Sequence, residues 1–290
     1  MTAEVELVLD ARAELGEAPI WDGDAGLLVW VDISAGVVHR TDPVKETDET
    51  IDVGRSVGSA MPTSDGRLAI ATDDGFWSVD PTTGRMEPIA RIDDLPGVMM
   101  NDGKTDRAGR YWAGTKDSEG RRPLGSLYRL DLDRTVTEVF GGVTISNGLA
   151  WSPDQRTMYF IDSATYGIDV LDSDPGSGTI SERRRLVDFP KEWGLPDGMT
   201  VDETGSLWVA FWTGSAVRRL DPEGTLVTTM ELPVSLVTSC AFGGPDLADL
   251  FVTSARTGLS EEQVQMEPHA GGLFRLRPGV RGARASAFGA

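Results

Sequence analysis

The chain has 290 residues and carries 46 acidic against 27 basic side chains, a formal net charge of −19 at pH 7. A surface this acidic repels phosphate backbones and anionic lipid headgroups, so nucleic-acid binding and membrane association are excluded as first hypotheses. The 34 glycines and 8 tryptophans favour a turn-rich all-β chain over a helical one.

The sequence also predicts a compartment. Cys240 is the one cysteine, so no intrachain disulfide can form and no oxidising compartment is implied. The first ten residues lack the basic segment of a signal peptide, and no apolar run of about 18 residues is long enough to span a bilayer. We therefore expect a cytoplasmic protein, either a monomer or a weak homo-oligomer.

Six strand-like segments, each preceded by a turn, recur along the chain. They span residues 26–33, 66–74, 109–116, 157–164, 205–212 and 249–256. A second strand signal follows most of them, at residues 76–80, 125–131, 167–172, 216–221 and 271–276, and ends in a turn. One helix is expected, over residues 259–266, because Ser260 and Gln263 have the spacing of a capping box.

The repeats predict the architecture. Six copies give a period of about 48 residues, which lies in the range of β-propeller blades. A small sheet cannot bury both of its faces alone, whereas six sheets packed around an axis can. We predict an all-β fold in which residues 1–290 form a single six-bladed β-propeller domain, with four-stranded antiparallel blades around a central channel. How the ring closes is not predicted.

One position of the repeat carries polar side chains. It lies four residues before the anchor of each inner strand and is occupied by Glu17, Ser59, Asn101, Asn147, Asp197 and, more loosely, Ser239. The innermost strands of a propeller run along the channel, so equivalent positions at their starts form a ring at one mouth. Two carboxylates and two amides would meet there.

Such a ring suggests a metal site. Two like charges about 4 Å apart repel by about 4 kcal/mol at an effective dielectric near 20, and a divalent cation offsets this repulsion. Oxygen ligands suit Ca²⁺ or Mg²⁺, and Zn²⁺ with added water is an alternative. The competing interpretation is that Asn147-Gly148 and Asp197-Gly198 are ordinary turn dipeptides. Glu17-Ala18 is not a turn dipeptide, yet it holds the same phase.

Other reactive residues are given structural interpretations. The G-x-S-x-G pattern at residues 54–58 lacks the following helix and the histidine partner of a hydrolase nucleophile elbow. We expect His39 and His269 to be surface residues and Cys240 to be a buried small hydrophobe.

The stretches "LGEAPIWD", "NDGKTDRAGRYWAGT", "ISNGLAWSPD" and "LPDGMTVDETGSLWVA", together with "GSLYRLD", "VTSCAFGG" and "AGGLFRL", resemble the regucalcin/gluconolactonase family, also called the senescence marker protein family. The resemblance implies a six-bladed propeller with one divalent metal in the channel mouth. It implies Glu17, Asn147 and Asp197 as metal ligands, Asn101 as a substrate-binding residue and Asp197 as the base. The expected ion is Ca²⁺ or Zn²⁺, with Mg²⁺ and Mn²⁺ as further candidates.

One departure from the family pattern concerns the substrate. Family members active on aldonolactones usually carry Arg two residues before the Asn that matches Asn101, and this chain has Met99. Methionine is apolar and adaptable, so the sugar-binding pocket is expected to differ. The loop over residues 116–125 is expected to overhang the mouth, and Lys116, Asp117, Glu119 or Arg121 could substitute for the missing arginine in holding the substrate.

The function expected is hydrolysis of a lactone ring, with a sugar (aldono) lactone as the first candidate, to give the hydroxy acid. The metal would act as a Lewis acid and Asp197 would remove a proton from the attacking water. Two alternatives stay open. The first is a metal-dependent aryl esterase or phosphotriesterase on the same scaffold, and the second is a non-enzymatic calcium-binding propeller. The partner expected is a small-molecule lactone, with no nucleic acid and no membrane.

Overall fold

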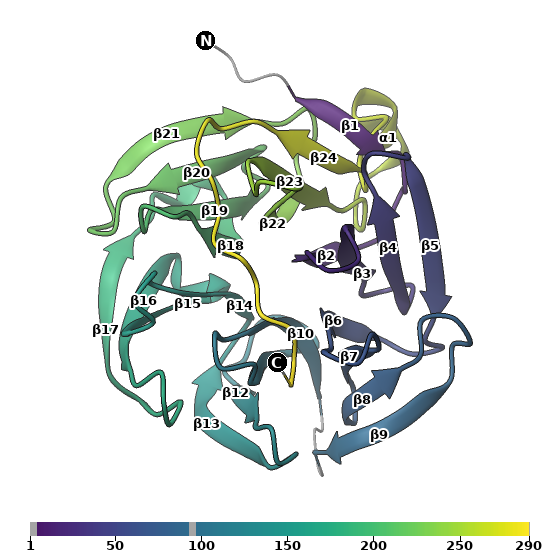
Figure 1. Cartoon of the computed structure of the whole chain (residues 1–290). Coiled ribbons are helices and arrows are strands. Elements are labelled where there is room, and N and C mark those ends of the chain that lie inside the picture. Colours follow the sequence, from purple (N-terminus) through teal and green to yellow (C-terminus); the bar gives the residue numbers. More distant parts are fainter. Residues whose placement is uncertain (1–4, 93–96, 290) are drawn as a thin grey trace.

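Nearly all regular structure in the chain is β-strand. The computed structural model describes residues 5–92 and 97–289. Six four-stranded antiparallel sheets stand around a common axis and form a six-bladed β-propeller (Figure 1). The predicted fold class is therefore confirmed. Residues 1–4, which belong to the ten-residue stretch analysed for a signal peptide, lie outside the described residues.

The blades are numbered by the order of their inner strands. Blade 1 holds β2 (Gly16–Asp22), β3 (Leu27–Asp32), β4 (Val37–Asp42) and β5 (Thr47–Asp52). Blade 2 holds β6 (Val57–Pro62), β7 (Leu68–Thr72), β8 (Gly75–Val79) and β9 (Met86–Arg91). Blade 3 holds β10 (Val98–Thr105), β11 (Tyr111–Asp117), β12 (Gly125–Leu130) and β13 (Val136–Val143).

The second half of the ring repeats the pattern. Blade 4 holds β14 (Ser146–Trp151), β15 (Thr157–Asp162), β16 (Gly167–Ser173) and β17 (Ile180–Asp188). Blade 5 holds β18 (Leu195–Val201), β19 (Leu207–Trp212), β20 (Ala216–Leu220) and β21 (Leu226–Glu231). Blade 6 holds β22 (Val237–Gly243), β23 (Asp249–Ser254), β24 (Leu273–Leu276) and β1 (Glu6–Leu9). The helical segments are η1 (Ser163–Thr165), η2 (Lys191–Trp193) and α1 (Glu261–Met266).

The ring is closed by the two ends of the sequence. β1 is the outermost strand of blade 6 and pairs antiparallel with β24, while β22 and β23 complete the same sheet. Glu6 on β1 forms an ion pair with Arg275 on β24. The last blade therefore cannot be completed without the N-terminal strand, a long-range pairing that the local repeat pattern does not reveal.

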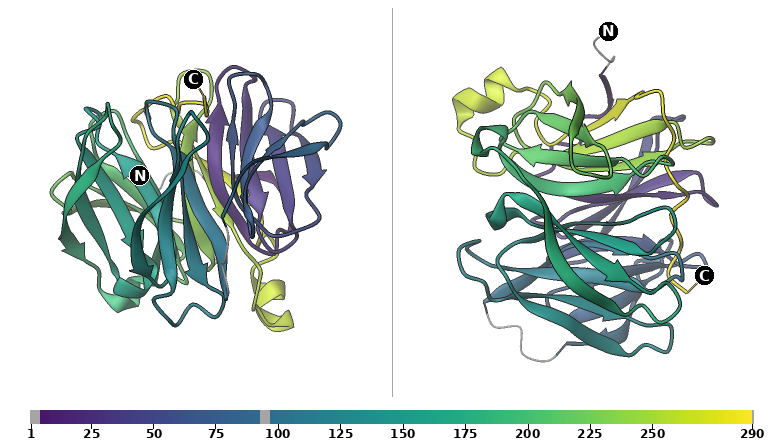
Figure 2. Two further views of the ribbon diagram at one scale, coloured as in Figure 1. Left: turned by 90° about the horizontal axis from the view of Figure 1, so that it is seen from below. Right: turned by 90° about the vertical axis from the view of Figure 1, so that its left-hand side faces the viewer.

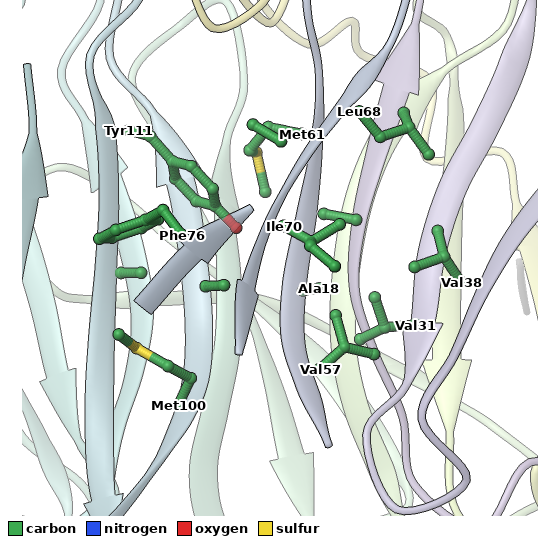
Figure 3. Close-up of a cluster of buried hydrophobic side chains, with 14 of the residues drawn as sticks. Ala18, Val31, Val38, Val57, Met61, Leu68, Ile70, Phe76, Met100 and Tyr111 are labelled. Atoms are coloured by element: carbon green, nitrogen blue, oxygen red, sulfur yellow. The ribbon is translucent and has the colours of Figure 1, made fainter. Parts of the chain in front are cut away.

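Burial explains the composition of the strands. The inner strand β14 is buried at every residue, whereas the outer strand β17 is largely exposed. Inner strands have a neighbouring blade against both faces, so they carry continuous apolar or small residues. Apolar clusters fill the space between blades. The cluster of Figure 3 includes Val31 of blade 1, Ile70 of blade 2 and Tyr111 of blade 3.

The C-terminal segment, residues 281–289, crosses one end of the propeller (Figure 1) and lies on the face opposite α1 (Figure 2). We call it the strap. The Gly282 nitrogen donates to the Leu247 carbonyl at 2.9 Å, and the Phe288 nitrogen donates to the Pro62 carbonyl at 2.8 Å. The Phe288 ring lies 6.4 Å from that of Tyr111. The strap thus links blade 6 with blade 2, which lie on either side of blade 1 in the ring.

The structure decides four local expectations, those for the cap at Ser260, for Cys240, for His39 and for His269. Ser260 caps α1 through a capping box with Gln263, and Cys240 is buried, as predicted. The expectation for His39 is wrong, because His39 is the cross-strand partner of Trp30 and stacks on its ring at 3.9 Å. The Asp48 carboxylate, 2.7 Å from His39 Nδ1, satisfies the imidazole in this position. His269 is half exposed.

Within the described residues, no helix has the length and apolar character needed to cross a bilayer.

Candidate functional site

Four predicted residues lie in the first halves of inner strands, toward one end of the propeller axis. Glu17 is on β2, Asn101 on β10, Asn147 on β14 and Asp197 on β18. All four are buried, with no more than 6% of each residue exposed. We call this end the site mouth. The four residues form two neighbouring pairs, Asn101 with Asn147 and Glu17 with Asp197.

A β-bulge occurs at each of these positions. The strand register shifts between Glu17 and Ile20, between Met100 and Gly103, between Ser146 and Leu149, and between Pro196 and Met199. A bulge places an extra residue on one strand and redirects its side chain. In a regular strand, alternate side chains would point into the space between the blades. The bulges instead allow the inner strands to turn these polar groups toward the axis.

The glycines after Asn147 and Asp197 have a packing reason. The dipeptides Asn147-Gly148 and Asp197-Gly198 lie inside strands, so their interpretation as turns is wrong. A Cβ at Gly148 would lie 2.9 Å from the Asp197 carbonyl oxygen, and a Cβ at Gly198 would lie 2.0 Å from Ser239 Oγ. Inner strands crowd together near the axis, and only glycine allows them to approach this closely.

The two amides are held in a chain of hydrogen bonds. Asn101 Nδ2 donates to Asn147 Oδ1 at 2.9 Å and to the Ser146 carbonyl at 2.7 Å. Asn147 Nδ2 donates to Ser163 Oγ at 2.8 Å, and this hydroxyl donates to the Pro196 carbonyl at 2.6 Å. The chain runs from blade 3 through blade 4 to blade 5 and fixes the orientation of both amides.

The two carboxyl groups lie close enough for each to shift the pKa of the other. Burial, followed by the charge of Asp102, raises the pKa of Glu17 to about 8. Burial, followed by the charges of Glu17 and Asp102, raises the pKa of Asp197 well above its usual range. The Ala18 nitrogen donates to Glu17 Oε2 at 2.8 Å, but Asp197 Oδ1 is buried without any hydrogen-bond partner. Two acids in this environment retain a proton at neutral pH unless a cation stabilises their charges.

This donor set fits a hard divalent cation. A buried carboxylate oxygen without a partner is the atom that a metal ion would satisfy, and carboxylate and amide oxygens are ligands for such ions. Within the described residues, no group of three or more His, Cys, Asp and Glu side chains is arranged to hold a metal. A site here therefore depends on the amide oxygen of Asn147 as well as on Glu17 and Asp197.

Two charged residues that follow Asn101 on β10 were not predicted. Asp102 and Lys104 follow Asn101 on β10, and Lys104 Nζ donates to the Met199 carbonyl at 2.6 Å. Burial raises the pKa of Asp102 to about 6 and lowers that of Lys104. Ser163 was also missed, because it lies outside the repeated position. The signal for Asp102 in the sequence is its position directly after Asn101. A bulge can redirect two consecutive residues together.

The four residues of the 116–125 loop that could replace the missing arginine have different environments. The Asp117 carboxylate accepts from the backbone nitrogens of Arg121 and Arg122, so it shapes the loop. Glu119 and Arg121 are exposed, and Glu119 Oε2 lies 3.7 Å from Arg121 Nη1. Lys116 is half-buried and its charge acts on both Glu17 and Asp197. Lys116 is thus the member of this group that faces the site, and it is the cross-strand partner of Met99.

A cavity of about 700 Å³ lies at the opposite end of the axis, beneath the strap. Its lining includes Lys104, Thr105 and strap residues 283–287, and contains none of the four polar residues of the site mouth. It is therefore separate from the carboxyl–amide cluster.

The architecture is that of a six-bladed propeller with a buried carboxyl–amide cluster at one end of its axis. Residues 15–256 match the family described as the SMP-30/Gluconolactonase/LRE-like region, and the chain belongs to this family. It is 38% identical to regucalcin from Xenopus laevis, with 98% of each chain covered. It is also 38% identical to a Bacillus subtilis protein provisionally named sugar lactone lactonase YvrE, with 92% of each covered.

A solved structure supports the same placement. The crystal structure of a calcium-binding protein, regucalcin, from Agrobacterium tumefaciens is 29% identical in sequence and superposes with a TM-score of 0.95. The match covers 99% of this chain and 98% of that one. The family predicted from the sequence motifs is therefore confirmed.

Proposed function

We propose that this protein is a divalent-metal-dependent lactonase that opens a lactone, with aldonolactones as the first candidates, to the hydroxy acid. The observation that carries the proposal is the buried pair Glu17 and Asp197, whose unpartnered Asp197 Oδ1 lies in a cluster with two ordered amides. Membership of a family named for gluconolactonase, and similarity to a relative named as a sugar lactone lactonase, support the reaction class.

Glu17, Asn147 and Asp197 would hold the ion. Ca²⁺ is the first candidate, since the similar structure is described as a calcium-binding protein, and Zn²⁺, Mg²⁺ and Mn²⁺ are alternatives. When bound, a divalent ion supplies Lewis-acid polarisation of a carbonyl oxygen. Asn101 would orient the substrate, because its Nδ2 is committed to Ser146 and Asn147 while its carbonyl oxygen is left to accept a hydroxyl proton.

Asp197 would act as the general base. It would take a proton from the attacking water as the water oxygen bonds to the carbonyl carbon. The ring C–O bond then breaks, and the proton returns to the departing ring oxygen as the hydroxy acid forms. For this role Asp197 must first lose the proton that its buried, acid-rich environment favours. Ion binding and catalysis are therefore linked through the same carboxyl group.

A second reaction class is supported by one observation. Met99 is a partly exposed apolar residue packed against the core, two residues before Asn101. An apolar wall suits the aromatic leaving group of an aryl ester or phosphotriester as well as it suits a lactone. A non-enzymatic calcium-binding protein is the third possibility, and the same experiment separates all three.

The test is a panel of lactones, aryl esters and phosphotriesters, assayed with chelator and again after return of single divalent ions. The proposal predicts that lactones are hydrolysed fastest, that chelator abolishes turnover and that an ion restores it. Faster turnover of aryl esters or phosphotriesters would select the second class. Metal binding without turnover of any compound would select the third and contradict the proposal.

A further inference from the structure

Lys116 has an unusual position between the two strands that carry the site amides. It lies near the end of β11, where its backbone pairs with Met99 on β10 and, on the other side, bridges to Ile145 just before β14. Met99 is two residues before Asn101, and Ile145 is two residues before Asn147. The backbone thus fixes Lys116 at the site mouth, beside the amide pair.

The side chain of Lys116 is directed by its cross-strand pairing. Residues directly opposite each other in an antiparallel pair project from the same face, with Cβ atoms about 4.5–5.5 Å apart. Lys116 therefore leaves the sheet beside Met99, and its charge acts on Glu17 and Asp197. Within residues 5–92 and 97–289, no carboxylate oxygen lies within 4.0 Å of Lys116 Nζ, the distance that defines an ion pair. Three N–H donors are thus held near the site, with no fixed ionic partner among the residues that the structure describes.

Apolar residues adjoin the polar residues of the site mouth. Four partly exposed apolar residues stand two positions before the four polar residues of the site mouth, namely Leu15, Met99, Ile145 and Leu195. Apolar side chains can pack against a ring but cannot satisfy a hydroxyl group. A polyhydroxylated lactone bound above Asn101 would lose water from its hydroxyl groups, and an unsatisfied polar group is costly.

We propose that Lys116 is a specificity-determining residue, whose ammonium donates hydrogen bonds to the hydroxyl oxygens of a lactone bound over Asn101. This inference rests on the proposed lactonase function and adds the group that recognises the substrate. Lys116 reaches the site from β11, across the strand pair from Met99, so the strand that carries Asn101 does not itself need to provide a cation.

Two six-membered lactones give a matched test. Glucono-1,5-lactone carries hydroxyl groups on the ring, whereas δ-valerolactone carries none. In Lys116→Met, the KM for gluconolactone should rise at least about tenfold, the effect expected for one charged hydrogen bond, while kcat changes little. The kinetic constants for δ-valerolactone should stay unchanged. A change in general stability or metal loading would affect both substrates equally.

Further variants separate recognition from folding. Lys116→Arg should retain most of the gluconolactone affinity, and Met99→Arg combined with Lys116→Met should recover it, because residue 99 projects from the same face. Lys45→Met is the control, since Lys45 is exposed on blade 1 and pairs with Asp42. Calorimetry should show that Lys116→Met binds the divalent ion at least as tightly as the unaltered protein, because a neighbouring positive charge has been removed.

The outcomes are distinct. If the unaltered protein hydrolyses neither lactone, the proposed function fails and the role of Lys116 fails with it. If both lactones are hydrolysed and Lys116→Met changes neither KM, or changes both equally, the role of Lys116 alone is refuted. Hydrolysis of δ-valerolactone without hydrolysis of gluconolactone would also refute this role, because hydroxyl recognition would then be absent.

Discussion

Asn101 Nδ2 donates to Asn147 Oδ1 across 2.9 Å and joins two inner strands that are 46 residues apart in sequence. On the other side of Asn147, Nδ2 donates to Ser163 Oγ, and this hydroxyl uses its one proton on the Pro196 carbonyl. Since Ser163 can then only accept from Asn147, the amide of Asn147 cannot reverse. Its oxygen is therefore kept on the side of Asn101, in one fixed orientation for the proposed role as a metal ligand.

Ser163→Ala should weaken divalent-ion binding. Without the hydroxyl, the Asn147 amide loses the acceptor that orients it, and residues that orient ligands typically contribute about 10–100-fold to metal affinity. Titration calorimetry of the Ser163→Ala variant measures this directly. Ser177→Ala, in an exposed turn of blade 4, is the matched control. Equal affinities in all three proteins would show that Ser163 does not position Asn147.

Asp197→Asn should keep the fold and remove most turnover. The amide retains an oxygen for the ion but cannot accept a proton from water, so kcat should fall by about 10²–10⁴-fold. The assay must be run at saturating metal, with the ion affinity of the variant measured separately. A kcat within a few-fold of the unaltered protein under those conditions would remove Asp197 from the role of base.

The metal-free protein should become less stable as the pH rises from about 4 to 8. The pKa of Glu17 is raised to about 8 and that of Asp197 is raised well above its usual range, from ordinary values of 4.5 and 3.8. Over this interval the unfolded chain releases protons that the folded chain retains, so the free energy of unfolding decreases. Thermal melts across this pH range should show a smaller loss of stability in Glu17→Gln, which lacks one of the two carboxyl groups.

The same shifts predict proton release on ion binding. Both carboxyl groups must be ionised to serve as ligands, so binding near pH 6.5 should release protons and the apparent affinity should increase toward pH 8. Calorimetry in two buffers with different ionisation enthalpies counts the protons released. Identical heats in the two buffers would mean that the carboxyl pair is already ionised or does not bind the ion.

Phe288→Ala should destabilise the ring without affecting ion affinity. Phe288 is half-buried against the core cluster and Tyr111, so the loss should be about 1–2 kcal/mol, below the cost at a fully buried site. Chemical denaturation should still show one transition, since residues 1–290 are predicted to form a single domain. Two separate transitions, or a large change in ion affinity, would contradict this account of the strap and the domain.

The sequence predicts much of this architecture because repeats encode the fold several times. Glu17, Asn101, Asn147 and Asp197 keep the same phase in four blades, so the spacing of the repeats is enough to predict that they converge. The closure of the ring cannot be predicted in this way, because β1 pairs with β24 through a contact that spans nearly the whole chain. Only global packing selects that pairing.

Local patterns misled where tertiary contacts dominate. Asn147-Gly148 looks like a turn, yet its glycine exists because the neighbouring inner strand leaves no room for a Cβ. His39 looks like an exposed polar residue, yet Trp30 and Asp48 enclose it. Lys116 could be named as one candidate among four, but its register opposite Met99 was needed to distinguish it. In each case the deciding partner lies on another strand.

The most direct test is crystallographic. A crystal grown with Mn²⁺, which scatters anomalously, should show one strong anomalous peak bounded by Glu17, the Asn147 amide oxygen and Asp197 Oδ1. The peak should disappear in the Glu17→Gln, Asp197→Asn double variant. A well-ordered map of the Mn²⁺-loaded protein with no peak among these three residues would contradict the metal site and the hydrolytic function built on it.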